Sequence, residues 1–117
     1  MSRLFVRAGG RVAEHDLAQF ATVTPGAEFV WVHLDGNSDD VDAILARIAH
    51  APPQAVAALK AHETRPRGGQ FGDGALVNLR GMGAASAPDG DPLISIRMWA
   101  EHALVVTLSF RELGVFE

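Results

Sequence analysis

Two arginines on either side of a proline are the residues of this sequence best suited to binding a ligand. Arg65 and Arg67 flank Pro66 in the stretch 61–81, AHETRPRGGQFGDGALVNLRG. Residues i and i+2 of an extended backbone project to the same side, so both guanidinium groups could hold a phosphate or a carboxylate. Pro66 also disfavours helical geometry at Arg65, so the step can end a helix and start a strand. We favour this structural role, with the arginines paired to carboxylates of the domain, over ligand binding.

Four residues are weak candidates for metal ligands. His62 and Glu63 are adjacent, and neighbouring side chains of an α-helix point about 100° apart, which does not suit one shared ion. Asp39 and Asp40 belong to an acidic run that we interpret as favourable charge at a helix N-terminus, with cation binding as the lesser alternative. We therefore assign no metal site from the sequence.

The other histidines give no sign of a catalytic or metal centre. His33 and Asp35 alternate on an expected strand without further ligands nearby, so we expect a hydrogen-bonding role there. His15, His50 and His102 fall in expected turns or helix ends, and we interpret them as solvated. The sequence also lacks GxxxxGK[ST] and GxSxG patterns, and Gly-Asp-Gly at 72–74 has no third glycine at dinucleotide-binding spacing. The sequence therefore predicts no enzyme.

Size and charge exclude several classes of protein. The chain has 117 residues, no cysteine and a formal net charge of −4, which suits one globular domain and excludes disulfides and thiolate metal sites. Its basic residues are scattered, whereas a nucleic-acid binder shows a clustered basic face. No apolar run approaches the roughly 18 residues of a membrane helix. We expect a soluble, cytoplasmic chain.

The order of expected elements predicts an α/β domain. A hairpin turns at Gly9-Gly10, a short helix covers 16–22, and 28–35 reads as a strand buried on both faces. Two helices follow, over 37–51 with Asn37 or Ser38 as its cap, and from Pro53 to about residue 63. Hairpins over 67–82 and 93–110 come next. The fold class is a mixed β-sheet with β-hairpins flanked by helices.

Periodicity also predicts which side chains form the core. The helix over 37–51 carries one apolar stripe, at Val41, Ile44, Leu45 and Ile48. In the last hairpin an apolar face formed by Ile94, Ile96 and Met98 faces the core in the first arm. In the second arm the expected core residues are Leu104, Val106, Leu108 and Phe110.

Taken in order, five segments resemble the cytoplasmic N-terminal domain of the CorA-like divalent cation transporters. The resemblance extends from Phe29 to Phe110, and its most specific piece is Arg65-Pro66-Arg67 between a helix and a paired strand. The form Thr-Arg-Pro-Arg looks most like the ZntB-type zinc transporter branch. The segments are WVHLDG, the helical pair, HETRPR, GDGALVNLRG and ISIRMWAEHALVVTLSF.

The resemblance implies a truncated α/β/α sandwich that assembles as a pentamer around a funnel. It further implies a single cytoplasmic domain over 1–117, part of a longer membrane protein and held at the membrane only through C-terminal helices outside this sequence. Such a domain would serve regulation or assembly, and zinc or magnesium would be the ion transported by the whole protein. The alternative is a free-standing α/β ligand-binding or interaction module without a membrane partner.

At two places the sequence departs from the pattern of the family, and these differences limit which family sites can be assigned to this chain. Magnesium-channel members commonly have a Glu-Asp pair eight or nine residues before the proline, and here those positions are Ala57 and Ala58. The regulatory metal site of those members is therefore not expected. Gly81-Met82-Gly83 is superficially similar to the family's Gly-Met-Asn pore signature, but it ends an expected strand with no membrane-length segment nearby.

Overall fold

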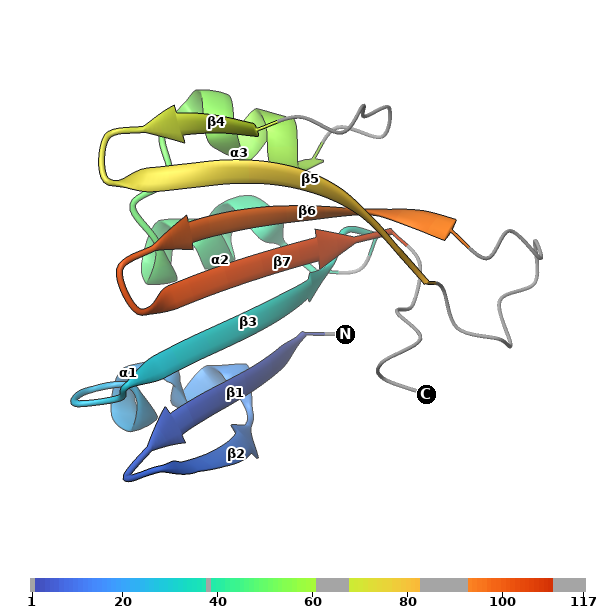
Figure 1. Ribbon diagram of the computed structural model, residues 1–117. Coiled ribbons are helices and arrows are strands. Elements are labelled where there is room, and N and C mark those ends of the chain that lie inside the picture. Colours follow the sequence, from blue (N-terminus) through green and yellow to red (C-terminus); the bar gives the residue numbers. More distant parts are fainter. Residues whose placement is uncertain (1, 38, 61–67, 83–92, 111–117) are drawn as a thin grey trace.

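The computed structural model describes residues 2–37, 39–60, 68–82 and 93–110 (Figure 1). Within them, seven strands form one sheet, accompanied by three α-helices and a short 3-10 helix. The strands are β1 (Arg3–Ala8), β2 (Arg11–His15), β3 (Phe29–Asp35), β4 (Gly68–Phe71), β5 (Gly74–Met82), β6 (Leu93–Glu101) and β7 (Leu104–Ser109). The helices are η1 (Leu17–Gln19), α1 (Phe20–Val23), α2 (Val41–Ile48) and α3 (Pro53–Lys60).

The sheet is mixed, with the strand order β2-β1-β3-β7-β6-β5-β4. Neighbouring strands are antiparallel except for the central pair, β3 and β7, which run parallel with Val32 opposite Val106. A parallel pair needs a long crossover connection, and here the crossover contains both α2 and α3 and the three remaining strands of that half. The β1–β2, β4–β5 and β6–β7 hairpins predicted from the sequence are confirmed.

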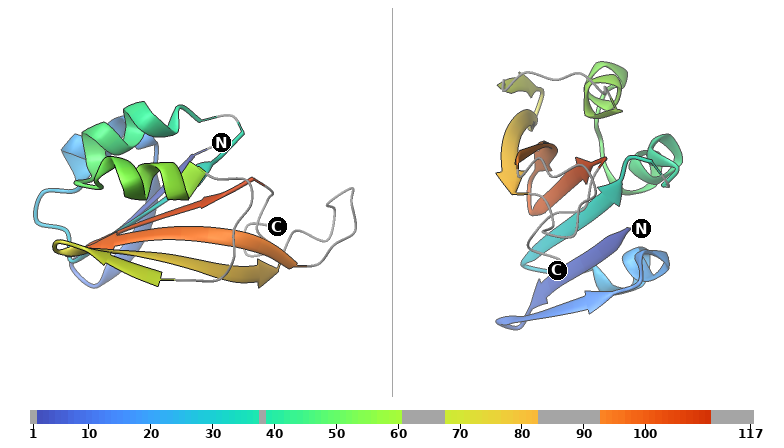
Figure 2. Two further views of the ribbon diagram at one scale, coloured as in Figure 1. Left: turned by 90° about the horizontal axis from the view of Figure 1, so that it is seen from above. Right: turned by 90° about the vertical axis from the view of Figure 1, so that its right-hand side faces the viewer.

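The helices lie together on one face of the sheet, as Figure 2 shows. The predicted stripe of α2 is confirmed, because Val41, Ile44, Leu45 and Ile48 are its buried residues. In α3 the buried residues are Ala55 and Leu59. Between these helices and the sheet lies the core, which also takes in Leu4, Val6, Val30, Val32, Leu34, Leu76, Trp99, Val106 and Leu108.

The opposite face of the sheet carries no helix within the described residues. Phe5 of β1 and Trp31 of β3 stack there with ring centroids 4.9 Å apart, and Phe29 is 42% exposed. The expectation that β3 is buried on both faces is therefore wrong at this end of the strand. Alternation along the strand puts Val30, Val32 and Leu34 toward the helices and the odd-numbered residues toward the other face. We call this second surface the helix-free face.

The predicted orientation of β6 is wrong. Trp99, paired in register with the core residue Val106, is only 1% exposed, whereas Ile96 and Met98 are half-buried on the helix-free face. Arg97 also lies on the helix side at 3% exposure, with its guanidinium 4.7 Å from the centre of the Phe110 ring, and burial lowers its pKa. The indole is large enough to decide which face is buried, although its neighbours Arg97 and Glu101 make that face look polar in sequence.

The fold class predicted from the sequence, a mixed sheet with hairpins flanked by helices, is confirmed. The described residues provide one helical layer of the expected α/β/α arrangement, on one face of the sheet. No helix among them is both long and apolar enough to cross a membrane.

Candidate functional site

Asp39 and Asp40, the acidic candidates for metal binding, lie between β3 and α2. The Asp39 carboxylate accepts a hydrogen bond from the backbone N–H of Asp35 at 2.7 Å. The Asp40 carboxylate accepts one from the backbone N–H of Ala43 at 3.2 Å and is the N-cap of α2. Both carboxylates thus serve the turn and the helix start, but α2 begins only at Val41, so Asp40 is its N-cap and not, as expected, a residue of its first turn. In the described parts of the chain, no three His, Asp or Glu side chains gather as a metal site would need.

The remaining sequence candidates lie outside the described residues. These are His62, Glu63 and the Arg65-Pro66-Arg67 step. The flanking elements are described: α3 ends at Lys60 and β4 begins at Gly68. The structural role of Pro66 and its flanking arginines between these two elements stays a prediction.

His33 is part of a buried polar row across the central parallel strands. The residue is 5% exposed, with Nδ1 2.7 Å from Thr107 Oγ1 and Nε2 3.3 Å from Ser109 Oγ. Trp31 Nε1 donates to the same threonine oxygen at 2.8 Å. Burial lowers the pKa of His33 to about 4, against a smaller opposing effect of Asp35, so the ring is neutral at neutral pH. The predicted hydrogen-bonding role of His33 is confirmed.

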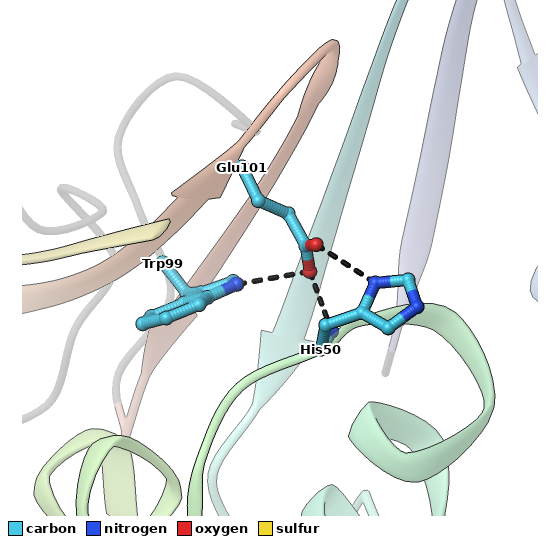
Figure 3. Close-up of polar contacts among 3 residues, drawn as sticks. All are labelled: His50, Trp99 and Glu101. Atoms are coloured by element: carbon cyan, nitrogen blue, oxygen red, sulfur yellow. Dashed lines mark hydrogen bonds and ion pairs between the residues drawn. The ribbon is translucent and has the colours of Figure 1, made fainter. Parts of the chain in front are cut away.

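Glu101, at the end of β6, holds the linker between α2 and α3 (Figure 3). Its Oε1 accepts from the backbone N–H of His50 at 2.6 Å and from Trp99 Nε1 at 3.0 Å. Its Oε2 lies within hydrogen-bonding distance of His50 Nδ1, at 2.9 Å. Burial acts to raise the pKa of Glu101, but the hydrogen bonds from His50 and Trp99 outweigh it and lower the pKa below its usual value. We call this arrangement the Glu101 clamp.

Sequence reasoning missed the Glu101 clamp. His50 was interpreted as solvated, and its side chain is indeed 93% exposed, yet its ring is bonded to a carboxylate that is only 10% exposed. The two residues are 51 positions apart, and no local pattern connects them. A glutamate beside a core tryptophan was the one available signal, since a buried indole N–H needs an acceptor.

A shallow groove of about 360 Å³ lies between α2 and α3. At one end, Lys60 Nζ and Asp42 Oδ2 form an ion pair at 2.6 Å. Ala57, one of the two alanines at which the resemblance would require a carboxylate, is part of its wall and offers only a methyl group. The lining residues are Asp42, Leu45, Ala46, Ala49, Ala51, Pro53, Val56, Ala57 and Lys60.

Comparison with protein families identifies the fold's relatives. Residues 26–117 match the family described as CorA-like Mg2+ transporter protein. The chain belongs to this CorA-like family. The resemblance drawn from the sequence is thereby confirmed, and the matched range contains the central strand β3, the helix pair and the Glu101 clamp.

Curated relatives place the chain beside the ZntB branch of the CorA-like family. It is 32% identical over 82 residues to the zinc transport protein ZntB of Klebsiella pneumoniae and 29% identical over 82 residues to that of an Enterobacter species. In both cases the match covers 70% of this chain and 25% of the relative. The chain therefore spans about a quarter of the length of the curated relatives it matches.

Solved structures share the fold across nearly the whole chain. The ZntB cytoplasmic domain of Vibrio parahaemolyticus matches 97% of this chain and 45% of its own, with a TM-score of 0.73 and 19% identity. Full-length CmaX matches with a TM-score of 0.71 and 26% identity over 98% of this chain and 36% of its own. The CorA magnesium transporter of Methanocaldococcus jannaschii matches with a TM-score of 0.67 at 10% identity, over 99% of this chain and 34% of its own.

Proposed function

We propose that this chain is a cytoplasmic regulatory and assembly domain of a CorA-like transporter for a divalent metal ion, zinc or magnesium. The observation that carries the proposal is the match of 97% of the chain to the ZntB cytoplasmic domain, with a TM-score of 0.73. The 32% identity to a zinc transport protein supports it independently from the sequence side. The domain works on the cytoplasmic side of the membrane and transports nothing by itself.

The structure suggests how such a domain contributes. A formal net charge of −4 favours the accumulation of cations near the domain. The helix-free face, with its stacked Phe5 and Trp31 and half-buried Ile96 and Met98, offers apolar surface for a second helical layer. We infer that other parts of a longer polypeptide supply this layer, and that the complete protein assembles as a pentamer.

We propose no catalytic reaction for the domain. The relatives matched are named as transporters, and His33 and Glu101 take part in structural hydrogen bonds. We assign no cofactor, and a divalent ion enters the proposal only as the transported cargo.

Reading the gene and reconstituting its product tests the proposal. We expect the reading frame to continue past the codon for Glu117 into two apolar spans. The full-length protein in liposomes should carry zinc or magnesium, followed with an entrapped metal-sensitive dye. Removing residues 1–110 should lower the pentameric fraction measured by mass photometry in detergent.

Two results would contradict the proposal. A stop codon directly after the codon for Glu117 would favour the alternative, a free-standing binding or interaction module. A full-length protein that forms pentamers and carries ions equally well without residues 1–110 would remove the assembly and regulatory role, although the family assignment would stand.

A further inference from the structure

The Glu101 clamp determines where the proton of the His50 ring lies. A carboxylate with a lowered pKa is ionised at neutral pH and can only accept hydrogen bonds. Nδ1 of His50, 2.9 Å from Glu101 Oε2, must therefore carry the proton. In the neutral ring, the lone pair is then on Nε2.

The same contacts fix the ring while leaving Nε2 accessible. Glu101 is anchored by Trp99 Nε1 and by the backbone N–H of His50 itself, so its carboxylate has little freedom to turn. The His50 side chain is 93% exposed and the Glu101 side chain 10%. Solvent and solutes can reach the imidazole but hardly the carboxylate that orients it.

We propose that His50 is a surface ligand for zinc, with Nε2 as the donor atom and Glu101 as the positioning residue. Metal-binding histidines typically donate their other ring N–H to a carboxylate, which fixes the tautomer and raises the basicity of the ligating nitrogen. His50 has this arrangement before any metal is bound. The inference concerns binding at this residue and does not depend on whether the whole protein transports ions.

The chemistry of the donor selects the ion. Imidazole nitrogen suits zinc and other late transition metals, whereas magnesium prefers oxygen ligands and keeps much of its water. No group of three ligating side chains exists among the described residues, so the proposal commits to His50 as a single donor. Binding at a single imidazole is weak and quickly reversible, as suits a site of capture and release rather than a structural one.

Nuclear magnetic resonance of the histidine rings tests the proposal on the intact chain. Long-range ¹H–¹⁵N spectra, recorded about one unit above the ordinary histidine pKa of about 6.5, report the tautomer and any metal contact for each ring. We expect the His50 Nδ1 to be protonated without metal. Its Nε2 should shift with zinc chloride but not with magnesium chloride.

Two other histidines of the described chain, the half-buried His15 and the exposed His102, serve as internal controls. His15 and His102 have no carboxylate on their rings in the described part of the chain, so they should respond only at higher zinc concentrations than His50. If His50 proves to be protonated on Nε2, or responds no more strongly to zinc than these two, the proposal is wrong. This comparison needs no variant.

Variants separate the ligand from its positioning residue. H50Q should abolish the most sensitive zinc response. E101Q should weaken zinc binding at His50 by about 10- to 100-fold, and its amide N–H₂ should favour protonation on Nε2. Backbone amide spectra would show that each variant is folded. Unchanged zinc affinity in folded E101Q would remove Glu101 from the proposal.

Discussion

The carboxylate of Glu101 accepts a hydrogen bond from the backbone N–H of His50 at 2.6 Å, joining the end of β6 to the linker between α2 and α3. This contact attaches the helix layer to the sheet by a polar bond at the point where the chain reverses. It also supplies the acceptor for the buried indole of Trp99. The position of the helix pair on the sheet therefore depends on one carboxylate as well as on apolar packing.

Replacing Glu101 with alanine should destabilise the fold markedly. The substitution leaves the N–H of the buried Trp99 indole without its acceptor, and a buried donor left unsatisfied costs about 1–3 kcal/mol. The exposed backbone N–H of His50 can be hydrated instead. We expect a loss of about 1–3 kcal/mol in the free energy of unfolding, measured with urea. H50A is the matched control: it removes only the exposed ring contact and should cost less than about 1 kcal/mol. Equal losses for both variants would contradict the importance of the indole contact.

The stability of the domain should fall as the pH drops through the range in which His33 titrates in the unfolded chain. Its folded pKa is about 4 against an ordinary value of 6.5, so the unfolded state binds the proton first. The stabilisation is complete above pH 6.5 and is lost progressively as the pH falls toward 4. One pKa unit corresponds to about 1.4 kcal/mol, which gives a loss of about 3 kcal/mol.

Urea unfolding at several pH values measures this effect. The variant H33Q keeps a polar side chain without a titrating ring, so its stability should change less between pH 6.5 and 4 than that of the wild type. The lowered pKa of Glu101 adds a loss in the same direction, but at the lower pH where carboxylates titrate. Parallel pH profiles for the two proteins would contradict the assignment to His33.

A side chain at Gly74 should be incompatible with the packing of Trp99. A Cβ atom built at Gly74 overlaps the indole ring, and overpacking of a core typically costs about 1–3 kcal/mol. G74A should lose stability in this range by thermal or urea unfolding. Combined with W99F, which shortens the ring, it should cost less than the sum of the two single changes. Strict additivity would show that the two positions do not interact.

Asp40 should stabilise α2 as a helix cap rather than as a metal ligand. D40A should lose about 1 kcal/mol, whereas D40N, with an equally good capping side chain, should stay close to the wild type. Urea unfolding with and without added magnesium or zinc measures both effects. Metal-dependent stabilisation that D40N abolishes would favour the ligand role instead.

Replacing Pro66 with alanine should cost only modest stability. Proline limits the backbone conformations open to the unfolded chain. Losing it at a compatible position therefore typically lowers the free energy of unfolding by about 0.4–1 kcal/mol. Thermal unfolding of P66A measures this, and circular dichroism reports whether the fold is kept. Unchanged stability with a large loss of binding to an anionic ligand such as phosphate would instead support a ligand role for the flanking arginines.

The sequence predicted those elements whose signal is local. The stripe of α2 and the run of β3 are set by residues a few positions apart, and the structure has both. The face that β6 buries could not be predicted in this way, because pairing with Val106 brings Trp99 to the core side, away from Ile96 and Met98.

The candidate sites show the same difference between local and long-range signals. The acidic start of α2 was predicted from its local run of aspartates, but the expected cap was Asn37 or Ser38, whereas α2 begins at Val41 and Asp40 is its N-cap. The Glu101 clamp depends on two residues 51 positions apart, and the His33 row depends on hydroxyl groups of a strand 74 positions away. Both arise only when the crossover brings distant strands together.

The central parallel pair constrains the order in which the domain can fold during synthesis. His33 and Thr107, neighbours across β3 and β7, are separated by 74 residues. At ribosomal rates of about 5–20 residues per second, this separation takes about 4–15 seconds to make. Until β7 is made, β3 can pair only with β1, and its other edge has no partner strand. The nascent chain is therefore exposed to misassociation in this interval, and binding of a chaperone to the segment around Val32 would shorten that exposure.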